Sequence, residues 1–393
     1  MDKEKKKRLD AAMATINKRF GKGTVSTAAQ MQKNGRLTKR IIRTASIELN
    51  DALWCGGFCG IVELFGPNSS GKTSLAIETI AAEQKRDPDF VAGWLETEGS
   101  VTDEMFTMHG VDMDRLIFWK QEDVGNAENA LDVARGIIAS GEVGMLVVNS
   151  VAGLSPSVEI ESDLDKQNIA LVARIMSKFF RVANGLISKN DMVVVFINQT
   201  RDNVGQLYGD PAIATGGRAL GYYASQRIRM SKPKLDSSDP IKIGEGVKIS
   251  CMTKKNRFSL GHDFETKCVY YATFAHGIDP IAPLPQMLKD KGIMTVKGSW
   301  WYYYDANGNV ITIDGIDGKF GSKGMFIDTL RNNESWKNAM LNIIRSDGPA
   351  MQTDEEKKDI DASNQSFNSL MADIDAEEAA AETGDPNLDG MPI

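Results

Sequence analysis

Residues 61–80 read IVELFGPNSSGKTSLAIETI, and this stretch decides the fold. The apolar run at 61–65 predicts a buried β-strand, and the residues from Ser74 onward have the apolar spacing of a helix. Between them, GPNSSGKT at 66–73 matches the pattern G-x-x-x-x-G-K-[ST]. A glycine-rich turn that opens a helix presents backbone N–H groups to phosphate oxygens. The context therefore predicts a nucleotide phosphate loop.

The chemistry of this loop gives a role to two of its side chains. Lys72 supplies a point charge for the β- and γ-phosphates, and Thr73 offers a hydroxyl to Mg²⁺. The predicted nucleotide-binding residues of the loop are Gly66, Pro67, Asn68, Ser69, Ser70, Gly71, Lys72, Thr73 and Ser74.

Strand-like and helical segments alternate along the chain. Apolar runs occur at 61–65, 91–95, 116–119, 145–148 and 192–197, and helical patterns lie near 73–85, 125–139 and 168–189. This alternation predicts an α/β fold with a mostly parallel, twisted sheet and helices on both faces. Two later runs, 247–252 and 267–273, have no long helix between them and predict added antiparallel strands.

Four segments can be predicted from periodicity and composition. An amphipathic helix at 5–20 cannot bury its own apolar stripe, so we expect it to dock on the main body or on a neighbouring subunit. Prolines between 280 and 285 mark a boundary, and 284–346, with WWYYY at 300–304, predicts a small α+β domain. The predicted domains are an N-terminal oligomerisation helix and linker (1–35), a nucleotide-binding core (36–280), the C-terminal domain (281–348) and an acidic disordered tail (349–393).

The net charge of −7 is unevenly distributed. Residues 351–393 carry twelve acidic residues against two lysines, a balance of −10 that leaves +3 for the rest of the chain. A mildly basic body with an acidic tail is typical of a protein that binds a polyanion and whose tail weakens that binding. A tail that only keeps the protein in solution explains the same charges.

Composition argues against several other classes. Four cysteines in 393 residues form no disulfide framework, and no second pair of ligands near Cys55 and Cys59 supports a zinc site. No apolar run approaches the roughly 18 residues of a membrane span, and no apolar stretch follows the basic N-terminus. We expect a cytoplasmic protein with no membrane partner.

Polar residues follow two of the predicted strands. GMLVVNSV at 144–151 reaches Asn149, where a nucleotide-hydrolysing fold usually places an aspartate that helps to hold Mg²⁺. WLETEGS at 94–100 places Glu96 and Glu98 at a strand end, where one of them could act as general base toward the attacking water. A solvated acidic turn is the alternative interpretation of these two glutamates.

Several ordered motifs resemble the RecA family of DNA recombinases. They are FGKGTV at 20–25, FGPNSSGKTS at 65–74, VVNSVAGLSP at 147–156, EIE at 159–161, ALVARIMS at 170–177, FINQTR at 196–201, TGGRAL at 215–220 and KKNRF at 254–258. The similarity extends over roughly residues 8–345. It implies a RecA-type core and a DNA-dependent ATPase that uses ATP and Mg²⁺. It also implies helical filaments on single-stranded DNA that pair with homologous duplex and exchange strands in recombinational repair.

The resemblance assigns the catalytic roles. It implies that Glu98 activates water and that Gln199 senses the γ-phosphate and signals to the DNA-binding loops. Lys72 keeps its place at the phosphates. Lys255 and Arg257 are implied to reach across a subunit interface to the neighbouring ATP; without the resemblance, KKNR is a surface basic patch.

The resemblance also implies two DNA-binding loops, at about 161–169 and 200–215. Ile169 and Val204 would wedge between base triplets, a role that residue type alone does not distinguish from core packing. The other implied DNA-binding residues are Ala170, Arg174, Ser177, Arg181, Gly205, Gly216, Gly217 and Arg218.

Departures from the family pattern give alternatives. Thr102 and Met105 stand at positions of adenine contacts, so nucleotide selectivity stays open. Asn149 lacks the charge of an aspartate and presents two donors to a cationic centre. We hypothesise that Mg-ATP still binds and that hydrolysis is slowed, unless Glu98 or Glu96 compensates. The competing functions are a nucleotide-gated single-strand coat with little turnover, favoured by Asn149, and a ring-shaped helicase motor.

Overall fold

The computed structural model describes residues 2–35, 37–162, 170–202, 212–214, 218–237, 239–259, 261, 265–305 and 307–346. The chain forms two compact units. The first comprises Met1–Ile42, Phe58–Gly66 and Glu83–Ile228, and the second comprises Arg43–Gly57, Pro67–Ala82 and Arg229–Ile393. Each unit has a hydrophobic core of its own.

Five parallel strands form the centre of the first unit. In spatial order they are β1 (Ile61–Gly66), β5 (Val193–Asp202), β4 (Met145–Asn149), β2 (Ala92–Glu96) and β3 (Leu116–Lys120). All five predicted apolar runs are strands, which confirms the α/β class. Their register aligns Gly66 with Gln199 and Glu96 with Asn149, so the polar residues at the carboxyl ends lie along one edge of the sheet.

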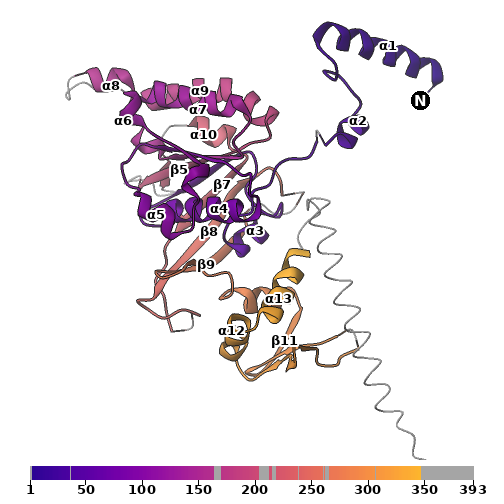
Figure 1. Ribbon diagram of the computed structural model, residues 1–393, viewed down its shortest axis with the longest axis vertical. Coiled ribbons are helices and arrows are strands. Elements are labelled where there is room, and N and C mark those ends of the chain that lie inside the picture. Colours follow the sequence, from indigo (N-terminus) through magenta and orange to yellow (C-terminus); the bar gives the residue numbers. More distant parts are fainter. Residues whose placement is uncertain are drawn as a thin grey trace, which may run out of the picture. The chain divides into compact units, whose positions relative to one another are not determined.

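Helices cover both faces of this sheet. Helices α7 (Ala127–Ser140), α9 (Leu171–Lys189) and α10 (Arg218–Tyr223) lie together on one face (Figure 1). Leu95 points into that core, and because side chains alternate along a strand, Trp94 points to the opposite face. There its ring packs edge-on against Phe106 of the short helix α5 (Asp103–Met108), with centroids 5.1 Å apart.

The N-terminal helices present apolar side chains to solvent. Helix α1 (Lys3–Phe20) contains no buried residue, and Leu9 and Phe20 are exposed. Helix α2 (Ala28–Lys33) begins with a capping box at Thr27. Docking of α1 on a neighbouring subunit stays a prediction.

Shorter elements complete the first unit. They are η1 (Met113–Arg115), α6 (Gln121–Val124), η2 (Val151–Gly153), α8 (Ser157–Glu161) and β6 (Ala212–Ala214). Strand β6 pairs antiparallel with the last residues of β5, from Thr200 to Asp202. Strand β7 (Gln226–Ser231) carries the chain into the second unit.

The second unit contains the predicted antiparallel strands. Strand β8 (Gly246–Asn256) pairs with β9 (Lys267–Thr273), and β9 pairs with the short β10 (Gly277–Ile278). Both predicted runs are therefore confirmed as antiparallel strands. Helix α3 (Ile47–Ala52) and the first part of α4 (Lys72–Arg86) also belong to this unit.

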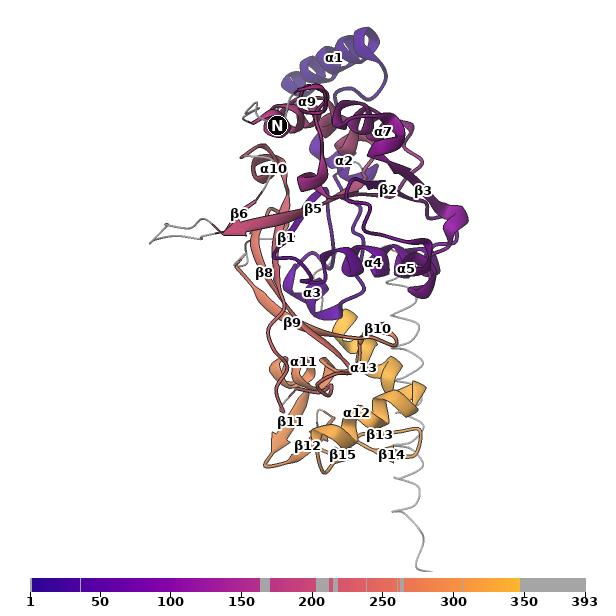
Figure 2. The same ribbon diagram turned by 90° about the vertical axis from the view of Figure 1, so that its left-hand side faces the viewer.

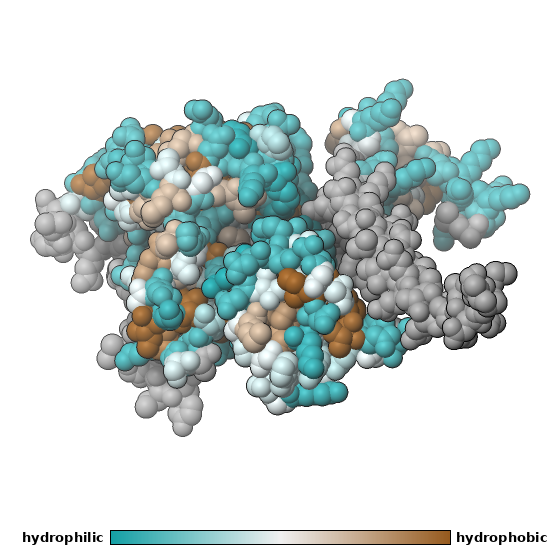
Figure 3. Space-filling model, turned by 60° about the horizontal axis from the view of Figure 1, so that its bottom comes forward, coloured by the Kyte–Doolittle hydropathy of each residue, from teal (hydrophilic) through white to brown (hydrophobic). Residues whose placement is uncertain are grey.

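The C-terminal part of the second unit is a small α+β module, drawn in Figure 2. Its elements are α11 (Leu284–Asp290), β11 (Met294–Lys297), β12 (Trp300–Tyr303), β13 (Thr312–Ile313), β14 (Ile316–Asp317), β15 (Lys319–Phe320), α12 (Lys323–Asn332) and α13 (Glu334–Ser346). Trp301 and Tyr303 alternate into a core with Trp336, while Trp300, Tyr302 and Lys297 lie on the outer face. Figure 3 shows small apolar patches on a mostly hydrophilic surface.

Glu48 of α3 makes a pH-dependent contribution to stability. Burial raises its pKa to about 8, mainly through loss of hydration, and Asp51 and Asp279 add to the rise. Ser46 donates to one carboxylate oxygen, and the other has no hydrogen-bond partner. Because the folded-state pKa lies above the unfolded value of 4.5, stability is greatest below pH 4.5 and is lost as the pH rises through about 8.

Glu48→Gln should therefore stabilise the protein at alkaline pH. The gain should be on the order of 5 kcal/mol at pH 9 and near zero below about pH 4, where the glutamate is neutral in both the folded and the unfolded chain. Urea unfolding at several pH values measures it. Glu142→Gln, at an exposed position, is the control and should show no such pH-dependent difference. An equal effect of Glu48→Gln at every pH would contradict this explanation.

Candidate nucleotide and DNA sites

The phosphate loop curls around its own lysine. Lys72 is 6% exposed, and its Nζ donates to the carbonyl oxygen of Pro67 at 2.7 Å and to the Ser70 hydroxyl at 3.2 Å. Gly71 has a φ of +83°, and a Cβ there would lie 3.2 Å from Cδ1 of Ile249 on β8. The turn thus needs glycine both for its backbone conformation and for its close packing.

These residues fit a polyphosphate. The ammonium group and the N-terminus of the 15-residue helix α4 both favour an anion. Lys72 would hold the phosphates, and Thr73 at the start of the helix would hold Mg²⁺ through its hydroxyl. Within the described ranges, no group of three His, Cys, Asp or Glu side chains could hold a metal ion.

The two glutamates after β2 have different surroundings. Glu96 is 2% exposed, whereas Glu98 is exposed and therefore accessible to water. Oε1 of Glu98 accepts hydrogen bonds from the Ser150 hydroxyl and from Nε2 of Gln199, the latter at 2.8 Å. The expected general base and the expected γ-phosphate sensor are thus in direct contact. This arrangement supports Glu98 over Glu96 as the base.

A buried ion pair supports the strand that carries Gln199. Asn198 donates to Oε1 of Glu63 on β1 at 3.0 Å, and Arg227 on β7 forms an ion pair with the other oxygen of Glu63. The Arg227 guanidinium also lies 4.9 Å from the ring centroid of Phe65. These contacts tie β5 to β1 and β7 next to the Glu98–Gln199 contact.

Asn149 ends β4 as a buried side chain. Its Nδ2 donates to Oε2 of Glu96 at 2.8 Å, and the Asn149–Ser150 peptide is cis. The same nitrogen also donates to the Ser100 hydroxyl at 3.4 Å, so the amide directs its donors at Glu96 and Ser100 and not, as expected, at a cation. Its role at Mg²⁺ stays a prediction.

Thr102 and Met105 lie in one turn at the start of α5. The Thr102 hydroxyl accepts from the backbone N–H of Met105 and caps the helix. Their contact with the base of the nucleotide stays a prediction.

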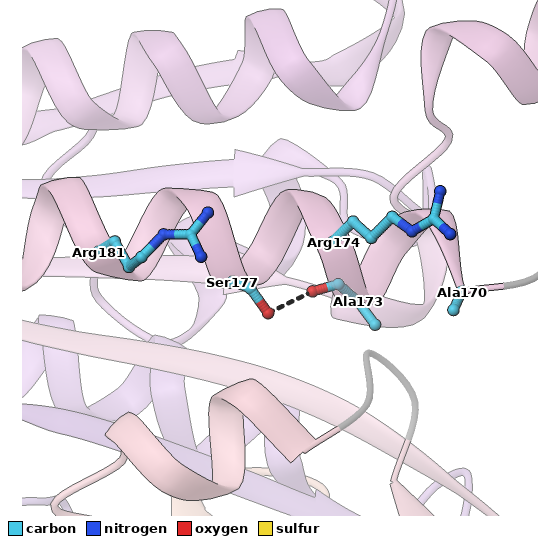
Figure 4. Close-up of a pocket in the computed structure, with 5 residues that line it drawn as sticks. All are labelled: Ala170, Ala173, Arg174, Ser177 and Arg181. Carbon is cyan, nitrogen blue, oxygen red and sulfur yellow. Dashed lines mark hydrogen bonds between the residues drawn. The ribbon is translucent and has the colours of Figure 1, made fainter.

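Four predicted DNA-binding residues lie along one side of α9. Ala170, Arg174, Ser177 and Arg181 line an open pocket of about 270 Å³ together with Ala173, as Figure 4 shows. Their spacing of three and four residues places them on one face of the helix. The Ser177 hydroxyl donates to the Ala173 carbonyl oxygen at 2.7 Å.

Of the other predicted DNA-binding residues, only Arg218 lies within the described ranges. Arg218 is exposed at the first position of α10. Ile169, Val204, Gly205, Gly216 and Gly217 lie outside the described residues.

Lys255 is the next-to-last residue of β8, and Arg257 follows the strand directly, so both lie far along the chain from the part of β8 that packs against the phosphate loop. Ile249, which packs against Gly71, precedes Lys255 by six residues on the same strand. At about 3.3 Å per residue, the two Cα atoms are roughly 20 Å apart. A lysine side chain spans only about a third of that distance. The geometry is unfavourable for contact with the loop of the same chain.

Sequence reasoning missed several of the residues that organise these contacts. Ser150 and Ser100 are hydrogen-bonded to the two glutamates, and Trp94 donates to Glu96. The position of Ser150 directly after Asn149 is the one signal that could have found it.

The fold and the loop define a phosphate-loop α/β protein of the nucleotide-binding class. The model of the RecA N-terminal domain matches residues 7–274. The protein RecA of Thermus aquaticus is 37% identical over 309 residues, which cover 77% of this chain and 86% of that relative. The RecA of Bacteroides thetaiotaomicron is 38% identical over 309 residues, covering 77% and 88%. The chain belongs to the RecA family.

One further finding concerns membranes. None of the helices in the described part of the chain is both long enough and apolar enough to cross a bilayer.

Proposed function

We propose that this protein is an ATP-dependent DNA recombinase. It polymerises on single-stranded DNA, pairs the strand with homologous duplex and exchanges strands, and ATP hydrolysis releases the filament. Family membership supports the class of activity. The observation that carries the proposal is the 2.8 Å hydrogen bond between Gln199 and Glu98.

This contact provides a route from nucleotide to DNA. Gln199 is followed at once by Thr200, where β5 begins to pair with β6, and the expected second DNA loop, at about 200–215, includes this paired segment. A change in the hydrogen bonding of Glu98 as ATP is consumed would alter the end of β5. Nucleotide state and DNA affinity would then be linked, and the linkage must act in both directions.

Self-association completes the proposal. Lys255 and Arg257 would neutralise charge on the ATP of an adjacent subunit, as an arginine finger does. The distance of Lys255 along β8 from Ile249, the packing site of Gly71, supports action in trans, and Arg257 follows two residues later. The exposed apolar residues of α1 support a second contact between subunits.

The arginines of α9 should supply part of the affinity for DNA. Replacing both Arg174 and Arg181 with alanine should weaken single-strand binding by about 10–100-fold at moderate salt. It should also reduce the slope of log affinity against log salt by about 1.4. Fluorescence anisotropy with an oligothymidine measures both quantities. Arg135→Ala on α7, an exposed arginine paired with Asp132, is the control. An unchanged slope would exclude phosphate contacts at these positions.

The strand-coating scaffold without turnover remains the second candidate because Asn149 stands where an acidic residue is expected. Phosphate release with and without single-stranded DNA, combined with a strand-exchange assay, separates the two. DNA-stimulated release together with exchanged product supports the recombinase. Filaments without release above background support the scaffold.

A further inference from the structure

Glu96 is a buried carboxylate to which the proposed function gives no role. Its Oε2 accepts from Nδ2 of Asn149 at 2.8 Å and from Nε1 of Trp94 at 2.9 Å. Its Oε1 accepts from the backbone N–H groups of Glu98 at 3.1 Å and Ser100 at 3.2 Å, and from the Ser100 hydroxyl at 3.4 Å. All five donors are neutral groups, and each directs a proton at a carboxylate oxygen.

This carboxylate determines how the Asn149 amide is oriented. An ionised carboxylate can only accept hydrogen bonds, so the amide nitrogen must face Glu96. The amide oxygen, on the other side of the group, keeps its acceptor character. Donation of an amide proton to a charged acceptor also polarises the carbonyl and strengthens its oxygen as an acceptor.

An aspartate at position 149 would not fit these surroundings. It would have no proton to donate, and it would bring a second carboxylate to about 3 Å from Glu96, where two like charges strongly disfavour each other. The paired ends of β2 and β4 therefore hold one negative charge between them, and it resides on Glu96.

The same carboxylate also holds the turn that presents Glu98. Its Oε1 fixes the N–H groups on both sides of Gly99, and Glu98 in turn receives the hydrogen bonds of Ser150 and Gln199. Glu96 therefore links the strand-end amide to the expected general base.

We propose that Glu96 is the acidic positioning residue of the nucleotide site, which compensates for the neutral Asn149 and orients Glu98. This inference rests on the proposed ATPase function for its catalytic part. The Asn149–Glu96 pair does what a single strand-end aspartate would otherwise do, so the amide does not by itself slow hydrolysis.

The test is a double-mutant cycle of Glu96→Gln, Asn149→Asp and the combined variant. Glu96→Gln places an amide donor against the donors of Asn149 and Trp94, and Asn149→Asp places two carboxylates together. Each single variant should lower the unfolding temperature of the nucleotide-free protein by several degrees. The combined variant exchanges amide and carboxylate and should regain at least half of the loss; the Trp94 contact is not restored.

The kinetics of ATP hydrolysis show whether Glu96 positions the catalytic groups or only stabilises the fold. Well below all unfolding temperatures, each single variant should lower kcat for DNA-stimulated ATP hydrolysis by about 10–100-fold and change KM for ATP by less than about threefold. The combined variant should recover at least half of that loss on a logarithmic scale. Additive losses, unchanged kcat in Glu96→Gln, or faster turnover in Asn149→Asp would each overturn the proposal.

The coupling between Glu96 and Asn149 and the proposed ATPase function are tested by separate measurements. The stability cycle uses nucleotide-free protein, so it decides the Glu96–Asn149 coupling even if the wild-type protein has no ATPase activity. Absence of wild-type turnover would instead contradict the proposed function. Glu98→Gln is the matched control: it should lose turnover while leaving the unfolding temperature nearly unchanged.

Discussion

Replacing Lys72 with alanine should abolish ATP-dependent assembly on single-stranded DNA and reduce ATP hydrolysis by at least about 10²–10³-fold. Lys72 is the one cationic residue of the phosphate loop. Its Nζ donates hydrogen bonds to the Pro67 carbonyl oxygen and the Ser70 hydroxyl at the N-terminus of helix α4. Without it, the backbone donors and the helix dipole must hold a triphosphate alone. Equilibrium binding of a fluorescent ATP analogue and steady-state phosphate release measure the two losses.

Lys85→Ala is the matched control for this variant. Lys85 is an exposed lysine near the other end of the same helix, so its removal changes the net charge equally. It should leave nucleotide affinity and turnover nearly unchanged. Retention of ATP-driven assembly by a correctly folded Lys72→Ala variant would contradict the assignment of the loop.

Replacing Lys255 and Arg257 together should give a different defect. The double alanine variant should bind ATP as a subunit with nearly the wild-type affinity, because its own loop is intact. Turnover on DNA should fall by about 10³–10⁵-fold, the range seen when a trans-acting cation is lost. The number of filaments on single-stranded DNA, counted by electron microscopy, should no longer rise when ATP is added.

The adjacent Lys254 provides the control for this pair. It lies on the same strand and pairs with Glu265 at 3.5 Å, so its replacement removes a neighbouring cation without touching the two proposed ones. Lys254→Ala should assemble normally. A loss of ATP affinity in isolated Lys255→Ala/Arg257→Ala subunits would indicate that these residues act within one chain.

Much of the fold could be predicted because it depends on local patterns. The run IVELF followed by GPNSSGKT contains the strand, the turn and the helix start in consecutive residues, and the structure places them at β1 and α4. The helical pattern near 168–189 likewise predicts α9, on one face of which the structure places Ala170, Arg174, Ser177 and Arg181, the residues that the family resemblance implies. Such features need only short-range periodicity.

The surroundings of the strand-end residues could not be predicted in the same way. Glu96 and Glu98 are two residues apart, and only the turn that follows β2 decides that one is buried and the other exposed. The partner of the Asn149 amide is Glu96, 53 positions earlier in the chain. Contacts of this kind depend on strand order and register, which residue type and spacing do not specify.

Complementation between two inactive variants tests the central claim most directly. Lys72→Ala has intact trans cations, and Lys255→Ala/Arg257→Ala has an intact loop. In filaments that the two variants form together at saturating single-stranded DNA, an equimolar mixture should regain up to about a quarter of the wild-type ATPase activity, because random head-to-tail order makes that fraction of interfaces complete. A mixture no more active than the sum of its components would contradict an ATP site that is completed by a second copy of the chain.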